Sequence, residues 1–165
     1  MNRVELLADR LDAARKWTNN LLADVEAPLW FKCPAAGVGH VAWQVGHLAA
    51  SQVALVPVRC LGLEPTKYVS DAFRATFGKG STPVEVHSKY PPLAEIRDTF
   101  DRIHSQTLEL IRGMAETDLD APAVGEPHPY FTTKAGAIGI AAMHETFHAG
   151  QIALIRRLAG KAPLR

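Results

Sequence analysis

Apolar residues recur at three- and four-residue steps along four long stretches of the chain, which is the spacing of helices that each bury one face. The stretches are residues 3–25, residues 41–61, a segment from about Pro92 to Met114, and a segment between Thr133 and Gly160. Thr132 or Thr133 can cap the start of the last helix, and Gly160 can end it. Pro57 predicts a kink near the end of the second helix, because proline removes one backbone donor.

The segments between these helices lack that period. A short helix is expected over residues 71–77, and the rest of residues 62–90 forms a long connector. Residues 116–131 are rich in proline and predict a second long connector. Because no stretch alternates as a strand does, the chain is predicted to be all-α. Four long amphipathic helices within residues 1–165 favour a single domain built as a helical bundle.

Charge and hydropathy along the chain argue against several classes of protein. The chain carries 18 basic and 17 acidic residues, for a formal charge of +1, and the scattered basic residues argue against a nucleic-acid surface. The N-terminus is amphipathic and charged from its third residue, unlike a signal peptide. Polar residues interrupt the most apolar stretch, residues 38–58, so this stretch would be a poor membrane span. We therefore expect a soluble, cytoplasmic protein.

Two histidines in the last helix are the first sign of chemistry. His144 and His148 are four residues apart, so they project side by side from one face of the helix. On a helical wheel they fall at the centre of the face that we expect to be buried, together with Gln151, Ala137 and Ile155. A buried imidazole without a partner is costly. A shared metal ion explains the pair, and the alternative is two ordinary histidines of the core or surface.

The sequence HETFH at residues 144–148 also matches the HExxH pattern of zinc proteases, in which the glutamate is the general base and the third ligand usually lies downstream. The 17 residues after His148 contain no His, Asp, Glu or Cys, so a downstream ligand is impossible. The protease interpretation is therefore set aside. Glu145 lies about 100° from His144 on the wheel. We expect it to be an exposed or interface carboxylate, and a role as catalytic base is the weaker alternative.

The third ligand must come from upstream, where five other histidines lie. His47 is the best placed, well inside the second helix, with Gln44 and Ser51 three and four residues away as possible donors to the ligand side chains. His40 shares the same side of that helix but lies at its end. Wheel geometry alone leaves His47 undecided, because it lies off the centre of the apolar face.

Two segments resemble the metal-site motifs of the DinB/YfiT-like superfamily. They are WQVGHLAASQ at residues 43–52 and HETFHAGQIALIRRLAG at residues 144–160. The intervening AFRATFGKGSTP also resembles the linker of that family, so the likeness covers most of the chain. The resemblance implies that His47, His144 and His148 bind one divalent metal ion. It further implies an antiparallel four-helix bundle of the DinB type, usually a homodimer.

The resemblance leaves the reaction open. Characterised relatives include transferases that join small thiols to electrophiles and thiol-dependent isomerases, and many other members are described only as metal-dependent hydrolases. Three neutral imidazoles suit zinc or nickel, and also iron or copper, and they leave the ion an open position. Such an ion can hold a thiol as thiolate, or lower the pKa of bound water to about 7. We expect a small-molecule substrate and thiol transfer, with a hydrolase or a non-catalytic binding bundle as alternatives.

Five further side chains near the motifs have open roles. Gln151 is expected either to donate to a ligand histidine or simply to pack the helix. His128 and Tyr130 of the PHPYF segment are considered for a thiol pocket, against a plain role as solvated loop residues. Trp43 and Phe147 flank the histidines and are expected in the core of the bundle rather than stacked on a substrate.

Overall fold

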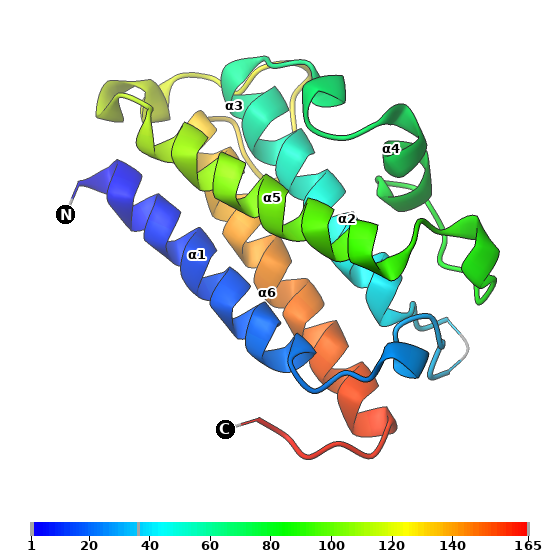
Figure 1. Ribbon diagram of the computed structural model, residues 1–165. Coiled ribbons are helices and arrows are strands. Elements are labelled where there is room, and N and C mark those ends of the chain that lie inside the picture. Colours follow the sequence, from blue (N-terminus) through cyan, green and yellow to red (C-terminus); the bar gives the residue numbers. More distant parts are fainter. Residues whose placement is uncertain (1, 36, 165) are drawn as a thin grey trace.

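The computed structural model describes residues 2–35 and 37–164, and its regular structure in these residues is helical (Figure 1). The long helices are α1 (Arg3–Leu22), α2 (Val41–Val53), α5 (Leu93–Arg112) and α6 (Lys134–Leu158). Helix α1 packs most extensively on α6, and α2 packs on α5. The all-α prediction is confirmed, and the β pairing found in the described residues is limited to two isolated bridges within residues 122–133.

Short helical elements occupy much of the connectors. They are η1 (Ala27–Leu29), η3 (Pro65–Lys67), α4 (Asp71–Phe77), η4 (His87–Lys89) and η5 (Glu116–Asp120). Two further short elements, η2 (Ala54–Val58) and α3 (Arg59–Leu61), continue the second long helix. Helix α4 confirms the short helix predicted over residues 71–77. Element η5 occupies the start of the connector predicted over residues 116–131, and the rest of that connector has no helix.

The ends of the long helices follow local signals in the sequence. The hydroxyl of Thr133 accepts a hydrogen bond from the backbone N–H of Gly136, so Thr133 caps α6 as one of the two predicted residues. Gly160, just beyond α6, has a φ of 82°, which is the left-handed conformation that ends many helices. Helix α1 ends at Leu22 rather than at residue 25.

The second long helix changes its hydrogen-bonding pattern around Pro57. Helix α2 continues directly into η2, a π-helical turn, and then into α3. Proline has no N–H to donate to the preceding turn, and the wider π turn accommodates the missing hydrogen bond. Where the sequence predicted a kink, the structure therefore has a local change of helix type. Gly62 ends this segment with a left-handed φ of 65°.

The same segment, Val41–Leu61, is long and apolar enough to span a membrane if only length and composition are considered. However, 67% of its most apolar window is buried inside the protein. Burial of this kind is typical of the core helix of a soluble protein, and it agrees with the expectation drawn from the polar residues within the segment.

Buried apolar residues form two clusters along the long helices. One cluster includes Leu48, Phe100, Ile103 and Ile152, and the other includes Leu11, Leu108, Ile111 and Ile138. Each long helix contributes a buried polar side chain to a hydrogen-bonded group between these clusters: Arg15 on α1, Gln52 on α2, His104 on α5 and Glu145 on α6. We call these four residues the polar layer. The core is thus two apolar parts separated by a layer that needs internal hydrogen bonds.

An ion pair lies at the centre of the polar layer. Nε and Nη2 of Arg15 donate to the two carboxylate oxygens of Glu145, at 2.8 and 3.3 Å. Nη1 donates to the backbone carbonyl of Phe100 at 2.8 Å, and the guanidinium carbon lies 3.3 Å from the centre of that ring. Gln52 links Arg15 to His104. Both buried charges in the layer are therefore paired, and Arg15 is held by further contacts with Phe100 and Gln52.

Arg15→Met is expected to destabilise the fold by about 3–5 kcal/mol, because it leaves the buried carboxylate of Glu145 without a partner. The double variant Arg15→Met/Glu145→Leu removes both charges and should recover most of that loss. Urea unfolding followed by far-ultraviolet circular dichroism gives the free energies of unfolding. Arg10→Met, at an exposed position of the same helix, is the control and should stay within about 0.5 kcal/mol of the wild type. Equal losses in the single and double variants would contradict the pairing.

Candidate metal centre

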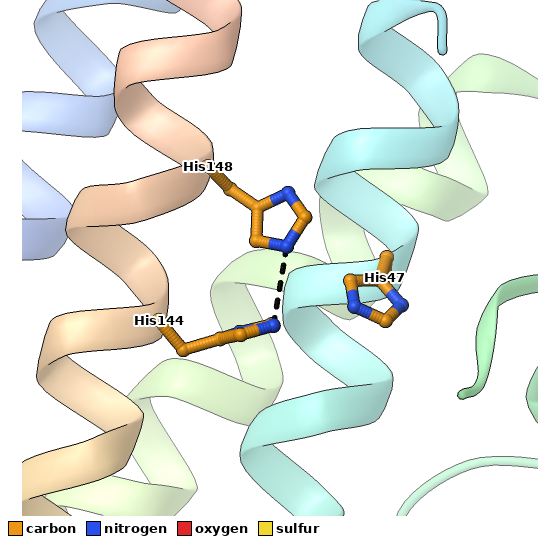
Figure 2. Close-up of side chains that lie close together, drawn as sticks. All are labelled: His47, His144 and His148. Carbon is orange, nitrogen blue, oxygen red and sulfur yellow. Dashed lines mark hydrogen bonds between the residues drawn. The ribbon is translucent and has the colours of Figure 1, made fainter. Parts of the chain in front are cut away.

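Three histidines from two helices gather at one point between α2 and α6. Figure 2 shows His47 on α2 beside His144 and His148 on α6. One ring nitrogen from each of them lies within 4.8 Å of the others. Imidazoles placed in this way could hold a metal ion. The structure thus brings together the three residues that the sequence singled out.

A backbone carbonyl at the end of α4 sets the orientation of His47. Nδ1–H of His47 donates to the carbonyl oxygen of Phe77 at 2.7 Å, so Nε2 keeps its lone pair and accepts a hydrogen bond from the Ser51 hydroxyl at 3.4 Å. Gly46 permits this contact, because a Cβ at that position would lie 2.4 Å from the Phe77 ring. Sequence reasoning did not single out Gly46 or Phe77, although a glycine inside an apolar helix is a signal of close packing.

Gln44 sets the orientation of His148. The amide oxygen of Gln44 can only accept, so it takes a hydrogen bond from Nδ1–H of His148. Gln44 therefore supports His148 as an acceptor, whereas we expected a donor. Nε2 of His148 lies 3.1 Å from Nε2 of His144 (Figure 2). Two nitrogens bound tetrahedrally to one zinc ion lie about 3.3 Å apart, so this spacing suits a shared ion.

Burial keeps the three imidazoles in the neutral form that metal ligands require. Burial first, and then the imidazoles of His144 and His47, lower the pKa of His148 to about 3, while the side chain of Gln151 opposes the shift. Burial and then His47 lower the pKa of His144 to about 4, against the opposing charge of Glu145. Burial also lowers the pKa of His47. At neutral pH each ring can therefore offer a lone pair to a cation, so the donor set fits a divalent ion.

Glu145 does not lie where the helical wheel placed it. We expected His144 and His148 at the centre of the buried face and Glu145 at its edge, yet Glu145 is 0% exposed and His144 is half-buried. The expectation of an exposed or interface carboxylate was wrong. The reason is Arg15, which brings a charged partner from another helix and makes the core a favourable place for the carboxylate. Because Arg15 binds both oxygens, the geometry does not support Glu145 as a catalytic base.

Other side chains border the three histidines. Trp43 stacks on His47 with ring centroids 4.6 Å apart and packs against the core, as expected. Phe147 was also expected in the core, but it is 65% exposed and lies with Met143 on the outer face of α6. The Ser51 hydroxyl lies 3.4 Å from Nε2 of His47, beside the nitrogen that would bind an ion. Ser51 is therefore the nearest hydroxyl that the sequence singled out.

Of the connector residues considered for a thiol pocket, His128 is half-buried and Tyr130 is exposed. His128 stacks on Phe131 with ring centroids 4.2 Å apart, and Tyr130 is 75% exposed. Arg59 donates to the carbonyl of Glu126 and lies over the Phe131 ring. These contacts hold the connector against the end of the second long helix. They do not join it to the three histidines, so a role for His128 or Tyr130 in ligand binding stays a prediction.

Comparisons with known proteins bear on the family and the fold of the chain. A family model described as "DinB superfamily" matches residues 10–152. Among solved structures, the crystal structure of the conserved protein of locus from Enterococcus faecalis is similar, with a TM-score of 0.68 and 18% sequence identity. The similarity covers 98% of this chain and 99% of that chain, and at this identity it shows the fold alone. No curated protein matches the chain.

In the metal-free protein, His144 and His148 should stay neutral down to about pH 5, with the proton of His148 on Nδ1, because their pKa values are about 4 and 3. Two-dimensional 15N NMR of the imidazoles across pH 4.5–8, roughly the range around the ordinary histidine pKa, measures both properties. His87, which is exposed and lies in η4, is the internal reference for signal quality. Titration of either residue near pH 6.5 would refute the buried, neutral arrangement.

The same shifts predict how stability depends on pH. An unfolded histidine has a pKa of about 6.5, so below that pH the unfolded chain binds protons that the folded chain does not. The free energy of unfolding of the metal-free protein should therefore fall as the pH drops from about 6.5 toward 4. Urea unfolding of the wild type and of His144→Gln/His148→Gln provides the measurement. The double variant should show a shallower fall, and equal slopes would mean that other groups cause it.

Proposed function

The chain belongs to the DinB superfamily, and on this premise we propose that His47, His144 and His148 bind one divalent metal ion in an enzyme that transfers a small thiol to an electrophilic substrate. The observation that carries the proposal is the convergence of three neutral imidazoles, two of which have Nδ1–H held by an acceptor. We also propose that the four long helices form the antiparallel, single-domain bundle of the DinB type. Zinc or nickel is the preferred ion, and iron or copper also suits three imidazoles.

The protein's own contribution to such a reaction is to hold the ligands in place. Phe77 and Gln44 fix the rings of His47 and His148, so little ring rotation has to be lost when an ion binds. When bound, a divalent ion with three neutral ligands keeps its full charge and an open position, and it favours the thiolate form of a thiol. The Ser51 hydroxyl beside His47 can donate a hydrogen bond to a group that enters there.

A hydrolase that uses metal-bound water is the second candidate. It needs no thiol pocket, and it uses the same three ligands. One observation disfavours it: within the described residues, the ligand-type side chains that gather at this point include no carboxylate, and neighbouring Glu145 is occupied by Arg15. A thiol loses its proton more easily than water does and has less need of such a base. We therefore prefer thiol transfer.

The purified wild-type protein is expected to carry roughly one divalent ion per chain, since three imidazoles form one site. His47→Ala and His144→Ala should lose the ion, and Gln44→Ala should weaken its affinity by about 10–100-fold, because the ring of His148 is then no longer fixed. Elemental analysis and chelator competition measure both effects. His87→Ala, in η4 away from the site, is the matched control and should keep the ion. Full occupancy in His47→Ala or His144→Ala would refute the assignment.

The metal-loaded protein should accelerate the reaction of a small thiol with monobromobimane at pH 7 by about tenfold or more, because only a few per cent of a free thiol is thiolate there. His144→Ala should abolish the acceleration. Bimane fluorescence gives the rate, and His87→Ala again serves as the control. Hydrolysis of activated esters without any thiol, together with no effect on the bimane reaction, would favour the hydrolase instead.

A further inference from the structure

We propose that a pocket beside the three histidines binds a small molecule that carries an oxyanion group, a carboxylate or a phosphate, on an apolar body. This inference rests on the proposed function, because it assigns the pocket to the co-substrate of the same site. The pocket has a volume of about 510 Å³ and lies between the second long helix and α4, which lie side by side (Figure 1).

The pocket adjoins His47, one of the three histidines, through two of its lining residues. Ser51 lines the pocket, and its hydroxyl lies 3.4 Å from Nε2 of His47. Gly78 also lines the pocket, and it directly follows Phe77, whose carbonyl holds the ring of His47. A molecule in the pocket would therefore have its inner end at Ser51, next to the His47 nitrogen that would bind an ion.

The floor of the pocket is apolar. Val53, Val58 and Pro65 line it, together with the methyl groups of Ala54 and Ala75. A surface of this kind favours an aliphatic segment and offers no partner to a polar one. A volume of about 510 Å³ is within the range of sites for small organic ligands. The body of the expected ligand is therefore apolar and small.

The outer rim of the pocket carries two cations. Arg74 and Lys79 both line it and both are exposed. Lys79 makes no ion pair with the residues that the structure describes. One nitrogen of Arg74 lies 3.3 Å from Asp71, whose carboxylate is 79% exposed, so solvent screens this pair and the other guanidinium donors stay available. The rim thus offers the planar guanidinium of Arg74 and the compact ammonium of Lys79. Both groups suit an oxyanion better than a neutral or cationic group.

The ligand expected from these features has its anionic end at Arg74 and Lys79 and its reactive end at Ser51. For a thiol-transfer enzyme, the simplest such molecule is a short thiol acid. Free carboxylates and phosphates share the anionic chemistry without the thiol. Their binding therefore reports recognition of the anionic group at the rim alone, without any contribution from a thiol at the histidines.

The test compares two matched thiols, 3-mercaptopropionate and neutral 3-mercaptopropan-1-ol, by isothermal titration calorimetry on the metal-loaded protein. The acid should bind more tightly, and Arg74→Gln/Lys79→Gln should raise its Kd by about tenfold or more while leaving the Kd of the alcohol unchanged. Asp71→Asn should lower the Kd of the acid by about twofold, because Arg74 loses a competing partner. Arg10→Gln removes a charge on α1 and should change neither value.

Two further measurements separate this proposal from the proposed function. Butanoate and propyl phosphate should bind the metal-free protein and lose that binding in Arg74→Gln/Lys79→Gln, and the tighter of the two identifies the oxyanion. Ala75→Phe, at an exposed position that lines the pocket, should block both thiols while the metal content stays the same. Equal affinity for the acid and the alcohol, or an unchanged Kd in the double variant, would overturn the pocket assignment. Loss of metal binding with retained butanoate or propyl phosphate binding would overturn only the proposed function.

Discussion

The buried ion pair between Arg15 and Glu145 sets the rotation of α6, and the position of the histidines follows from it. A carboxylate inside the core must face its cation, so Glu145 points into the polar layer. His144 and His148, one residue before it and three after it, then turn to the flank of the helix that faces α2. A rotation that centred the histidines would move the carboxylate outward and leave Arg15 buried without a counter-charge. The polar layer therefore supports the fold and also orients His144 and His148 toward α2.

The arrangement of the three histidines depends on hydrogen-bond acceptors that other residues supply. The Phe77 carbonyl and the Gln44 amide oxygen each take an Nδ1–H, which fixes both the tautomer and the ring plane. Burial then makes protonation costly, so the remaining nitrogens keep their lone pairs. Gly46 is part of the same construction, because a side chain there would push Phe77 away from α2. Neutral, oriented imidazoles result from packing as much as from the choice of histidine.

Features that depend on residues close together in the chain could be predicted from the sequence, whereas features that depend on distant residues could not. The helix period, the Thr133 cap and the stop at Gly160 are local signals, and the structure confirms them. The buried position of Glu145 depends on Arg15, 130 residues away in the chain, so a wheel drawn for one helix cannot foresee it. The prediction that Phe147 lies in the core was wrong for a related reason, because a helical wheel does not show which apolar side chains another helix covers.

The site residues show the same division. The His144 and His148 pair follows from a spacing within one helix, whereas His47 needed the motif resemblance, because it lies off the centre of its apolar face. The role of the Phe77 carbonyl could not be predicted from the sequence, because a residue of any type can supply a backbone acceptor at that position.

The ion pair has an electrostatic consequence for the cluster. By binding both oxygens of Glu145, Arg15 keeps the nearest carboxylate of the motif away from the imidazoles, so the ligand set carries no negative charge. An ion held by neutral ligands would retain its charge and attract an anion to its open position. The rim of the neighbouring pocket acts in the same direction, since Arg74 and Lys79 outnumber the single exposed carboxylate of Asp71. A free Glu145 at the cluster would cancel part of that attraction. Sequestering one carboxylate in the core is thus a condition for the fold and also for the binding of negatively charged ligands that we propose.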